Sequence, residues 1–342
     1  MAKQVIFNKK NVVVIGGAGF IGSHLCDRLV DDSKVICIDN FSTGNERNID
    51  HLLSDPNFRF IKHDLCEPII LEELQELEDF KVEFQGIQEI YNLACPTSVF
   101  NFEENRVANL TANSLLVKNA LDLALKYQSK FLHFSSSVVY GEHHEQTKII
   151  NESEIGAVDN LSARASYDEG KRFAETIVST YRSYFDIDAK IIRPFRIYGP
   201  RMPLGDGQMI PDFISNALDN EDLIIYGDEN FSSAFCYIDD CVSAALKMMD
   251  SNQAGPINIG SDVRIKLTDL AKKITKILGS ASNIRHEQAM LFMTPLALPD
   301  ITKARDTLGW MPIVILDNGL EKTINDLRAS KGIKSIHQYV KG

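Results

Sequence analysis

Tyr167 and Lys171 are the pair whose types and spacing most directly suggest chemistry in this sequence. They lie four residues apart in the segment 165–171, so on a helix their side chains share one face. A nearby ammonium group favours the phenolate form of tyrosine and lowers the pKa of the phenol. A phenol tuned in this way can take a proton from a hydroxyl group, which makes Tyr167 a candidate general base.

A glycine-rich turn near the start of the chain predicts a phosphate site. Residues 11–15 form a continuous apolar run, typical of a strand buried on both faces. Gly16, Gly19 and Gly22 follow at once, and an amphipathic stretch continues to residue 30. In this context glycines allow a tight turn, close approach of the backbone to a diphosphate and close helix–strand packing. Free amides and the helix dipole at the helix start then favour negative charge.

A second apolar run, residues 34–38, ends in Asp39, 17 positions beyond Gly22. A carboxylate there can accept hydrogen bonds from a ribose diol and would repel a 2′-phosphate, so it predicts NAD rather than NADP. Further strand-like segments recur with helical patterns between them; they lie near residues 57–62, 88–94, 129–134 and 188–193. The alternation predicts an α/β fold with a Rossmann-type, doubly wound parallel sheet.

The GxxGxxG spacing, together with Asp39-Asn40-Phe41 after the second strand, resembles the extended short-chain dehydrogenase/reductase family. Asp64-Leu65 resembles the pair that holds the adenine in that family, and Leu93-Ala94-Cys95 resembles its small-residue turn beneath the dinucleotide. The resemblance implies NAD as the cofactor. The residues that it implies as cofactor contacts are Gly16, Gly19, Phe20, Ile21, Gly22, Asp39, Asn40, Phe41, Ser42, Thr43, Gly44, Asp64, Leu65, Leu93, Ala94, Cys95, Tyr167, Lys171 and Pro194.

The same resemblance adds a third catalytic group, Ser136. The family places a catalytic hydroxyl four residues before a second tyrosine, here Tyr140, in the serine-rich segment 134–141. Tyr140 lacks a lysine four residues further on, so we interpret it as structural or substrate-lining. The predicted catalytic set is Ser136, Tyr167 and Lys171. We expect no metal, since the charged run 142–145 is more typical of a solvated loop.

Motifs in the later part of the chain resemble the nucleotide-sugar epimerase/dehydratase branch of this family. They are the segments 193–201, 225–227, 237–240, 257–260 and 298–300. Within the branch, three segments are most similar to UDP-glucuronate decarboxylases: 39–44, 165–172 and 199–202. The resemblance implies an NAD-binding domain over residues 1–193 with part of 230–260. An interleaved, smaller nucleotide-sugar-binding lobe would occupy 194–330, and 331–342 would form a tail.

Four positions depart from the decarboxylase pattern. Val138 replaces a glutamate, Ser233 an arginine, Arg196 an asparagine and Ala297 an arginine. A valine cannot transfer a proton, so the usual decarboxylation or 4,6-dehydration loses a group it needs. Arg196 can grip a diphosphate bidentately, or it can mark a rebuilt pocket for a different sugar. The predicted substrate contacts are Ser98, Ser137, Arg196, Arg201 and Tyr226.

The groups that remain suit removal of a hydroxyl proton while NAD takes a hydride from the same carbon. We therefore favour C4 epimerisation of a nucleotide-activated sugar through a transient 4-keto intermediate. The alternatives are UDP-glucuronate decarboxylation or 4,6-dehydration with altered acid/base residues, and a 4-oxidoreductase that releases the ketosugar. A non-enzymatic NAD-sensing scaffold is a further alternative, against which the intact Tyr167/Lys171 pair argues.

The 342 residues carry 47 acidic and 36 basic side chains, a net charge of −11. This balance argues against nucleic acid or an anionic membrane surface as a partner. Six cysteines without a CxxC pair favour free thiols and a cytoplasmic protein. Apolar residues on the expected helices 105–127 and 166–185 suggest a homodimer, as in relatives. The acidic run 71–78 predicts a solvated amphipathic helix.

Overall fold

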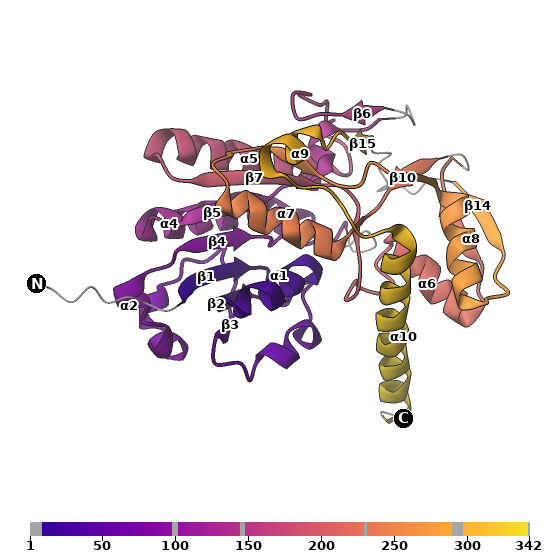
Figure 1. Cartoon of the computed structure of the whole chain (residues 1–342), viewed down its shortest axis with the longest axis horizontal. Coiled ribbons are helices and arrows are strands. Elements are labelled where there is room, and N and C mark those ends of the chain that lie inside the picture. Colours follow the sequence, from indigo (N-terminus) through magenta and orange to yellow (C-terminus); the bar gives the residue numbers. More distant parts are fainter. Residues whose placement is uncertain (1–8, 98–101, 144–147, 229–230, 289–296, 341–342) are drawn as a thin grey trace, which may run out of the picture.

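A seven-stranded parallel sheet lies at the centre of the computed structural model, which describes residues 9–97, 102–143, 148–228, 231–288 and 297–340 (Figure 1). The strands follow the order β12-β7-β5-β4-β1-β2-β3, and each neighbouring pair is parallel. Their bounds are β1 Lys10–Ile15, β2 Ser33–Asp39, β3 Phe58–Lys62, β4 Glu89–Asn92, β5 Lys130–Phe134, β7 Ala189–Pro194 and β12 Ile257–Ile259. The doubly wound parallel sheet predicted from the sequence is confirmed.

The central strand β1 shows why these apolar runs form a sheet buried on both sides. Val12 and Val14 join one apolar cluster, and Val13 and Ile15 join the other. Successive side chains of a strand point to opposite faces, so a run of four apolar residues serves both layers of helices.

Helices cover both faces of the sheet. One face packs against α1 (Phe20–Val30) and α7 (Ile238–Asp250). The other packs against α4 (Val117–Tyr127) and α5 (Ala165–Phe185). Shorter helical elements of this part of the chain are η1 Glu46–Asn48, η2 Asp50–Leu52, η3 Leu71–Glu73, η4 Gln75–Phe80, α2 Val82–Gln85, α3 Arg106–Thr111, η5 Ala112–Leu116 and η6 Ser137–Tyr140.

A second group of elements, which includes α6, α8, β14 and α10, lies to one side of the sheet (Figure 1). It pairs β9 with β14 in parallel and packs α6 against α8 and α10. The remaining elements are β6 Ile149–Ile150, β8 Ile197–Tyr198, α6 Met209–Asp219, β9 Leu223–Tyr226, β10 Ser232–Ala234, β11 Cys236–Tyr237, β13 Arg264–Lys266, α8 Leu267–Leu278, β14 Ile284–Glu287, β15 Leu298–Pro299, α9 Thr302–Leu308 and α10 Leu316–Val340.

The structure differs from the sequence-based expectation in two helical segments. The acidic run does not form the amphipathic α-helix that we expected, because η3 and η4 are 3₁₀ helices. The helix expected over 105–127 forms without a break from Arg106 to Tyr127, but it contains the π-helical turn η5 between α3 and α4. In addition, residues 331–340, predicted as a tail, form the last turns of α10. The Lys331 ammonium there donates a hydrogen bond to the Ser215 carbonyl at 2.8 Å.

Candidate active site

The glycine turn joins β1 to α1 and brings three backbone segments very close together. Gly16 has a φ of +79°, and a Cβ there would lie 2.8 Å from the Ala94 amide nitrogen. A Cβ on Gly22 would lie 2.2 Å from the Gly16 carbonyl oxygen. Gly19 is the N-cap of α1 and makes no side-chain capping bond. The helix amides therefore face the turn without a side chain over them, which is the geometry that a dinucleotide diphosphate needs.

Asp39 closes the turn from the end of β2. Its Oδ2 accepts a hydrogen bond from the Ala18 amide at 3.0 Å, and its Oδ1 accepts one from the Phe41 amide at 2.8 Å. Burial raises the pKa of this carboxyl, while the two amides act against that effect. Nearby, the Asn40 side-chain amide donates to Asp64 at 3.0 Å, which joins the ends of β2 and β3.

A cleft of about 610 Å³ runs along the carboxyl ends of β1, β2, β4 and β5. It lies where the strand order reverses between β1 and β4, the usual ligand position in open α/β sheets. The predicted residues that line it are Gly16, Gly19, Phe20, Ile21, Gly22, Asp39, Asn40, Ser42, Thr43, Gly44, Asp64, Leu65, Leu93, Ala94, Cys95, Ser136, Tyr167, Lys171, Pro194, Arg196 and Arg201.

Ser136, Tyr167 and Lys171 meet at one wall of this cleft. Tyr167 and Lys171 lie on α5, and Ser136 is the N-cap residue of η6, directly after β5. The Ser136 hydroxyl lies near enough to the Tyr167 phenol to lower its pKa, and it accepts a hydrogen bond from the Val138 amide at 3.3 Å. The Lys171 ammonium is buried, lies 6.0 Å from the centre of the Tyr167 ring and donates to the Phe134 carbonyl at 2.9 Å.

The protein groups around Tyr167 do not by themselves lower the pKa of its phenol. Burial raises that pKa above its ordinary value, and the Cys95 side chain adds to the rise. The Ser136 hydroxyl and the charge of Arg164 act in the opposite direction. The lowering expected from the sequence therefore depends on the positive charge of a bound nicotinamide.

Arg196 brings a positive charge into the cleft. Its backbone has a φ of +38°, and its guanidinium lies over the Phe231 ring at 5.9 Å. Burial and the neighbouring Arg164 lower the pKa of Arg196 to about 10. Arg164 is held by Asp168, with bonds of 3.2 and 2.9 Å to the two carboxylate oxygens. A ligand that places an anionic group beside Arg196 would relieve the repulsion between the two arginines.

Several other residues predicted to contact ligand lie differently. The Arg201 guanidinium pairs with Asp27 of α1 at 2.8 Å, although Arg201 lines the cleft. Three predicted residues do not line the cleft, and a fourth lies outside the described residues. Phe41 packs on the Phe60 ring, Ser137 is buried in η6, Tyr226 ends β9, and Ser98 is the one that is not described.

Val138 and Ser233, which replace the usual acid/base and cationic groups, are both buried, with 5% and 3% of their surface exposed. Neither is among the residues that line the cleft. The cleft also contains residues that the sequence analysis did not propose, among them Arg47, His63 and Gln208. Arg47 lies three residues after Gly44, in the segment that follows Asp39. This position is the signal from which its place in the cleft could have been predicted.

Residues 12–260 match the NAD-dependent epimerase/dehydratase family. UDP-glucuronic acid decarboxylase 2 of Arabidopsis thaliana is 37% identical over 318 residues, covering 93% of this chain and 68% of that protein. UDP-glucuronic acid decarboxylase 1 of Xenopus tropicalis is 35% identical over 336 residues, covering 97% and 76%.

Two solved structures resemble this fold closely. The UDP-glucose 4-epimerase of Thermotoga maritima, solved with UDP-glucose, superposes with a TM-score of 0.81 at 26% identity and covers 94% of this chain and 99% of that one. The UDP-glucuronic acid 4-epimerase of Bacillus cereus, in complex with UDP-glucuronic acid and NAD, gives 0.80 at 26% identity, covering 93% and 99%. Together with the diphosphate-sized turn and the cleft, these matches show that the chain is an NAD-dependent enzyme of the epimerase/dehydratase family.

Proposed function

We propose that the protein catalyses C4 epimerisation of a nucleotide-activated sugar. The observation that carries the proposal is the arrangement at the cleft wall, where Ser136, Tyr167 and Lys171 line the same cleft and Lys171 lies beside the Tyr167 ring. This set supports oxidation and reduction at one carbon. The positions that relatives use for further chemistry hold Val138 and Ser233, neither of which can act as a proton donor and acceptor near neutral pH.

In the proposed mechanism, Tyr167 removes the proton from the sugar 4-hydroxyl and Ser136 orients that hydroxyl through its own hydrogen bond. Lys171 is fixed by the Phe134 carbonyl and stabilises the phenolate that forms. Bound NAD supplies the site that accepts a hydride and later returns it. Arg196 holds the diphosphate, so the ketosugar can turn within the cleft and be reduced from its other face.

The cofactor site would be formed by the glycine turn, Asp39 and the residues that follow β3 and β4. Gly16 and Gly22 have no room for a Cβ, so the turn can approach a diphosphate closely. The Asp39 carboxylate is bound by two amides, and its remaining lone pairs can accept the ribose hydroxyls. The adenine end would lie between Asn40, Asp64 and Leu65.

UDP-glucuronate decarboxylation is the second candidate, and one observation favours it. The curated relatives named above are decarboxylases that match almost the whole of this chain. Oxidation at C4 of a glucuronate also creates a β-keto acid, which loses carbon dioxide with little further help. Decarboxylation would then proceed without the glutamate and arginine that Val138 and Ser233 replace.

Mass spectrometry of products from a panel of UDP-, GDP-, CDP- and dTDP-sugars, each incubated with protein and NAD, separates the candidates. Epimerisation leaves the mass unchanged, and proton NMR then shows inversion at C4. Loss of carbon dioxide, of water or of two hydrogens identifies decarboxylation, dehydration or oxidation, respectively. Robust release of carbon dioxide from UDP-glucuronate would overturn the proposal in favour of the second candidate.

A further inference from the structure

One face of α5 binds the end of β5 through two hydrogen bonds. Tyr167, Lys171 and Glu175 follow each other at intervals of four and therefore lie along the same side of the helix. Lys171 donates to the Phe134 carbonyl, and the Ser135 hydroxyl donates to Glu175 at 2.5 Å. Tyr167 lines the same cleft as Ser136, the next residue along the chain. The helix that carries the candidate base thus also fixes the strand end that carries its hydroxyl partner.

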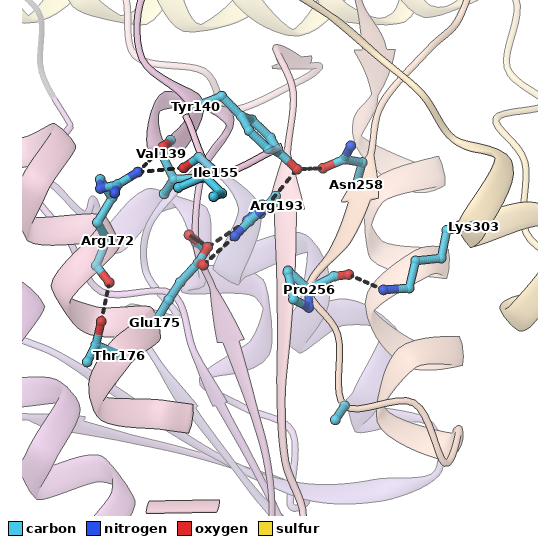
Figure 2. Close-up of polar contacts among 12 residues, drawn as sticks. Val139, Tyr140, Ile155, Arg172, Glu175, Thr176, Arg193, Pro256, Asn258 and Lys303 are labelled. Carbon is cyan, nitrogen blue, oxygen red and sulfur yellow. Dashed lines mark hydrogen bonds and ion pairs between the residues drawn. The ribbon is translucent and has the colours of Figure 1, made fainter. Parts of the chain in front are cut away.

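Glu175 is itself held in a fixed orientation by Arg193 of β7 (Figure 2). The arginine Nε donates to Glu175 Oε1 at 2.8 Å, and Nη2 donates to Oε2 at 2.6 Å. Only 11% of the Arg193 side chain and 13% of the Glu175 side chain are exposed. A bidentate pair fixes the plane of the carboxylate, so Oε1 can accept the Ser135 hydroxyl in only one position.

The pair continues into a buried chain of hydrogen bonds across the sheet. Arg193 Nη1 donates to the Tyr140 hydroxyl at 2.8 Å, and that hydroxyl donates to Asn258 Oδ1 of β12 at 2.7 Å (Figure 2). Arg193 and Asn258 are also register partners in the β7–β12 pairing. This explains Tyr140 as a structural residue and gives the Glu175 carboxylate a rigid support.

We propose that Glu175 is a positioning residue, which acts through Ser135 to hold the Ser136 hydroxyl against the Tyr167 phenol. Glu175 is not among the residues that line the cleft; it borders a separate outer groove of about 710 Å³, which residues of α5 and β7 line. It can therefore affect the reaction only through the residues that it holds. The proposal rests on the role of Tyr167 in the function proposed above.

The test uses Ser135→Ala, because Glu175→Ala would leave Arg193 with a buried and unpaired charge and endanger folding. The NAD-saturated protein is titrated to about pH 11 while phenolate absorbance is recorded, and the matched Tyr167→Phe protein is subtracted. We expect the Tyr167 titration to move upward by about 0.5 to 1 pH unit, which corresponds to the loss of one hydrogen bond to the phenolate. The variants leave in place the other groups around Tyr167, which are Cys95, Arg164, Asp168 and Lys171.

Ser129→Ala is the matched control. The Ser129 hydroxyl is buried, donates to the Ile87 carbonyl at 2.8 Å and precedes the opposite end of the same strand. It should lower stability without moving the Tyr167 titration. Glu175→Gln keeps an acceptor for Ser135 and should give a smaller upward movement than Ser135→Ala.

An unchanged titration in Ser135→Ala, or an equal movement in Ser129→Ala, would overturn the proposal. So would a Tyr167 that does not titrate below about pH 11 in the NAD complex, since there would be no tuned phenol for Ser136 to support. The measurement needs no sugar nucleotide. Failure of the proposed epimerisation, which the product masses report, is therefore distinguishable from failure of this proposal.

Discussion

Tyr167 combines a half-buried ring with one hydroxyl partner, so its acid/base behaviour depends on a few nearby groups. Tyr167→Phe keeps the ring and removes only the phenolic hydroxyl. We expect hydride transfer to fall by at least about 100-fold while NAD stays bound, since general acid–base catalysis commonly contributes that much. Hydride transfer is followed by nicotinamide absorbance in the presence of a sugar nucleotide that the unaltered protein converts. A titration with NAD checks that the cofactor still binds. Activity equal to that of the unaltered protein would show that another residue is the base.

Asp39 accepts one hydrogen bond from the Ala18 amide of the glycine turn and one from the Phe41 amide after β2, so its side chain fixes the turn, and we propose that its charge also faces the ribose. Asp39→Ala should weaken NAD about tenfold, the cost of losing a charged hydrogen bond. It should also relax the preference over NADP, because Arg47 also lines the cleft and remains to attract a 2′-phosphate.

Equilibrium titration of both cofactors checks the Asp39 prediction. Asp50→Ala, which removes an exposed carboxylate of η2, is the control and should leave the NAD/NADP ratio unchanged. Tighter binding of NADP than of NAD by the unaltered protein would contradict the assignment of Asp39.

At the scale of elements, α6 contains a carboxyl whose burial links stability to pH. Burial and the neighbouring Asp206 raise the pKa of Asp212 to about 6, from 3.8 in an unperturbed chain. Between these values the folded state binds more protons than the unfolded state, so stability falls as pH rises through this window. Above this pH window, the buried and ionised carboxylate lowers the free energy of unfolding by a constant amount, about 1 to 3 kcal/mol.

Asp212→Asn should therefore raise the free energy of unfolding near pH 8 by about 1 to 3 kcal/mol and have little effect near pH 4. Denaturant unfolding of both proteins at the two pH values gives the comparison. A difference of the same size at both pH values would mean that the substitution acts through packing rather than through charge.

Six strands of the central sheet were predictable because each is a short, largely apolar run, as in the run 34–38 that ends at Asp39. The strand β12 and most of the short strands outside the sheet have no such run. The acidic segment carried a signal that we misread. Its apolar residues recur at intervals of three, a spacing that fits the 3.0 residues per turn of a 3₁₀ helix better than an α-helix. These residues are Leu71, Leu74, Leu77 and Phe80.

For the whole molecule, local motifs indicated about half of the residues that line the cleft, because each motif lies close after a strand and parallel strands end at one edge. Contacts between distant segments left no such pattern. The ion pair of Arg201 with Asp27 joins residues that are 174 positions apart in the sequence. The hydrogen bond of Ser135 to Glu175 joins residues that are 40 positions apart. These contacts depend on how α1 and α5 pack on the sheet, which spacing along the chain does not encode. No helix in the described part of the chain is long and apolar enough to cross a membrane.

The outer face of α3 and α5 supports the prediction of a homodimer. The two elements pack against each other, and they expose Leu110 and Phe173 by 50% and 54%. Ile177 and Tyr181, which follow Phe173 at intervals of four on α5, pack against the core instead. An apolar surface of this kind on adjacent helices is typical of a protein–protein contact.

Sedimentation at micromolar concentration should give the mass of two chains. The double variant Leu110→Glu/Phe173→Glu should sediment as a monomer, because an isologous contact would bring four buried carboxylates together across the two-fold axis. Phe84→Glu is the control: Phe84 is 75% exposed on α2, away from this face, and its substitution should leave the dimer intact. A monomeric unaltered protein would refute the dimer, and a double variant that still dimerises would place the contact on another surface.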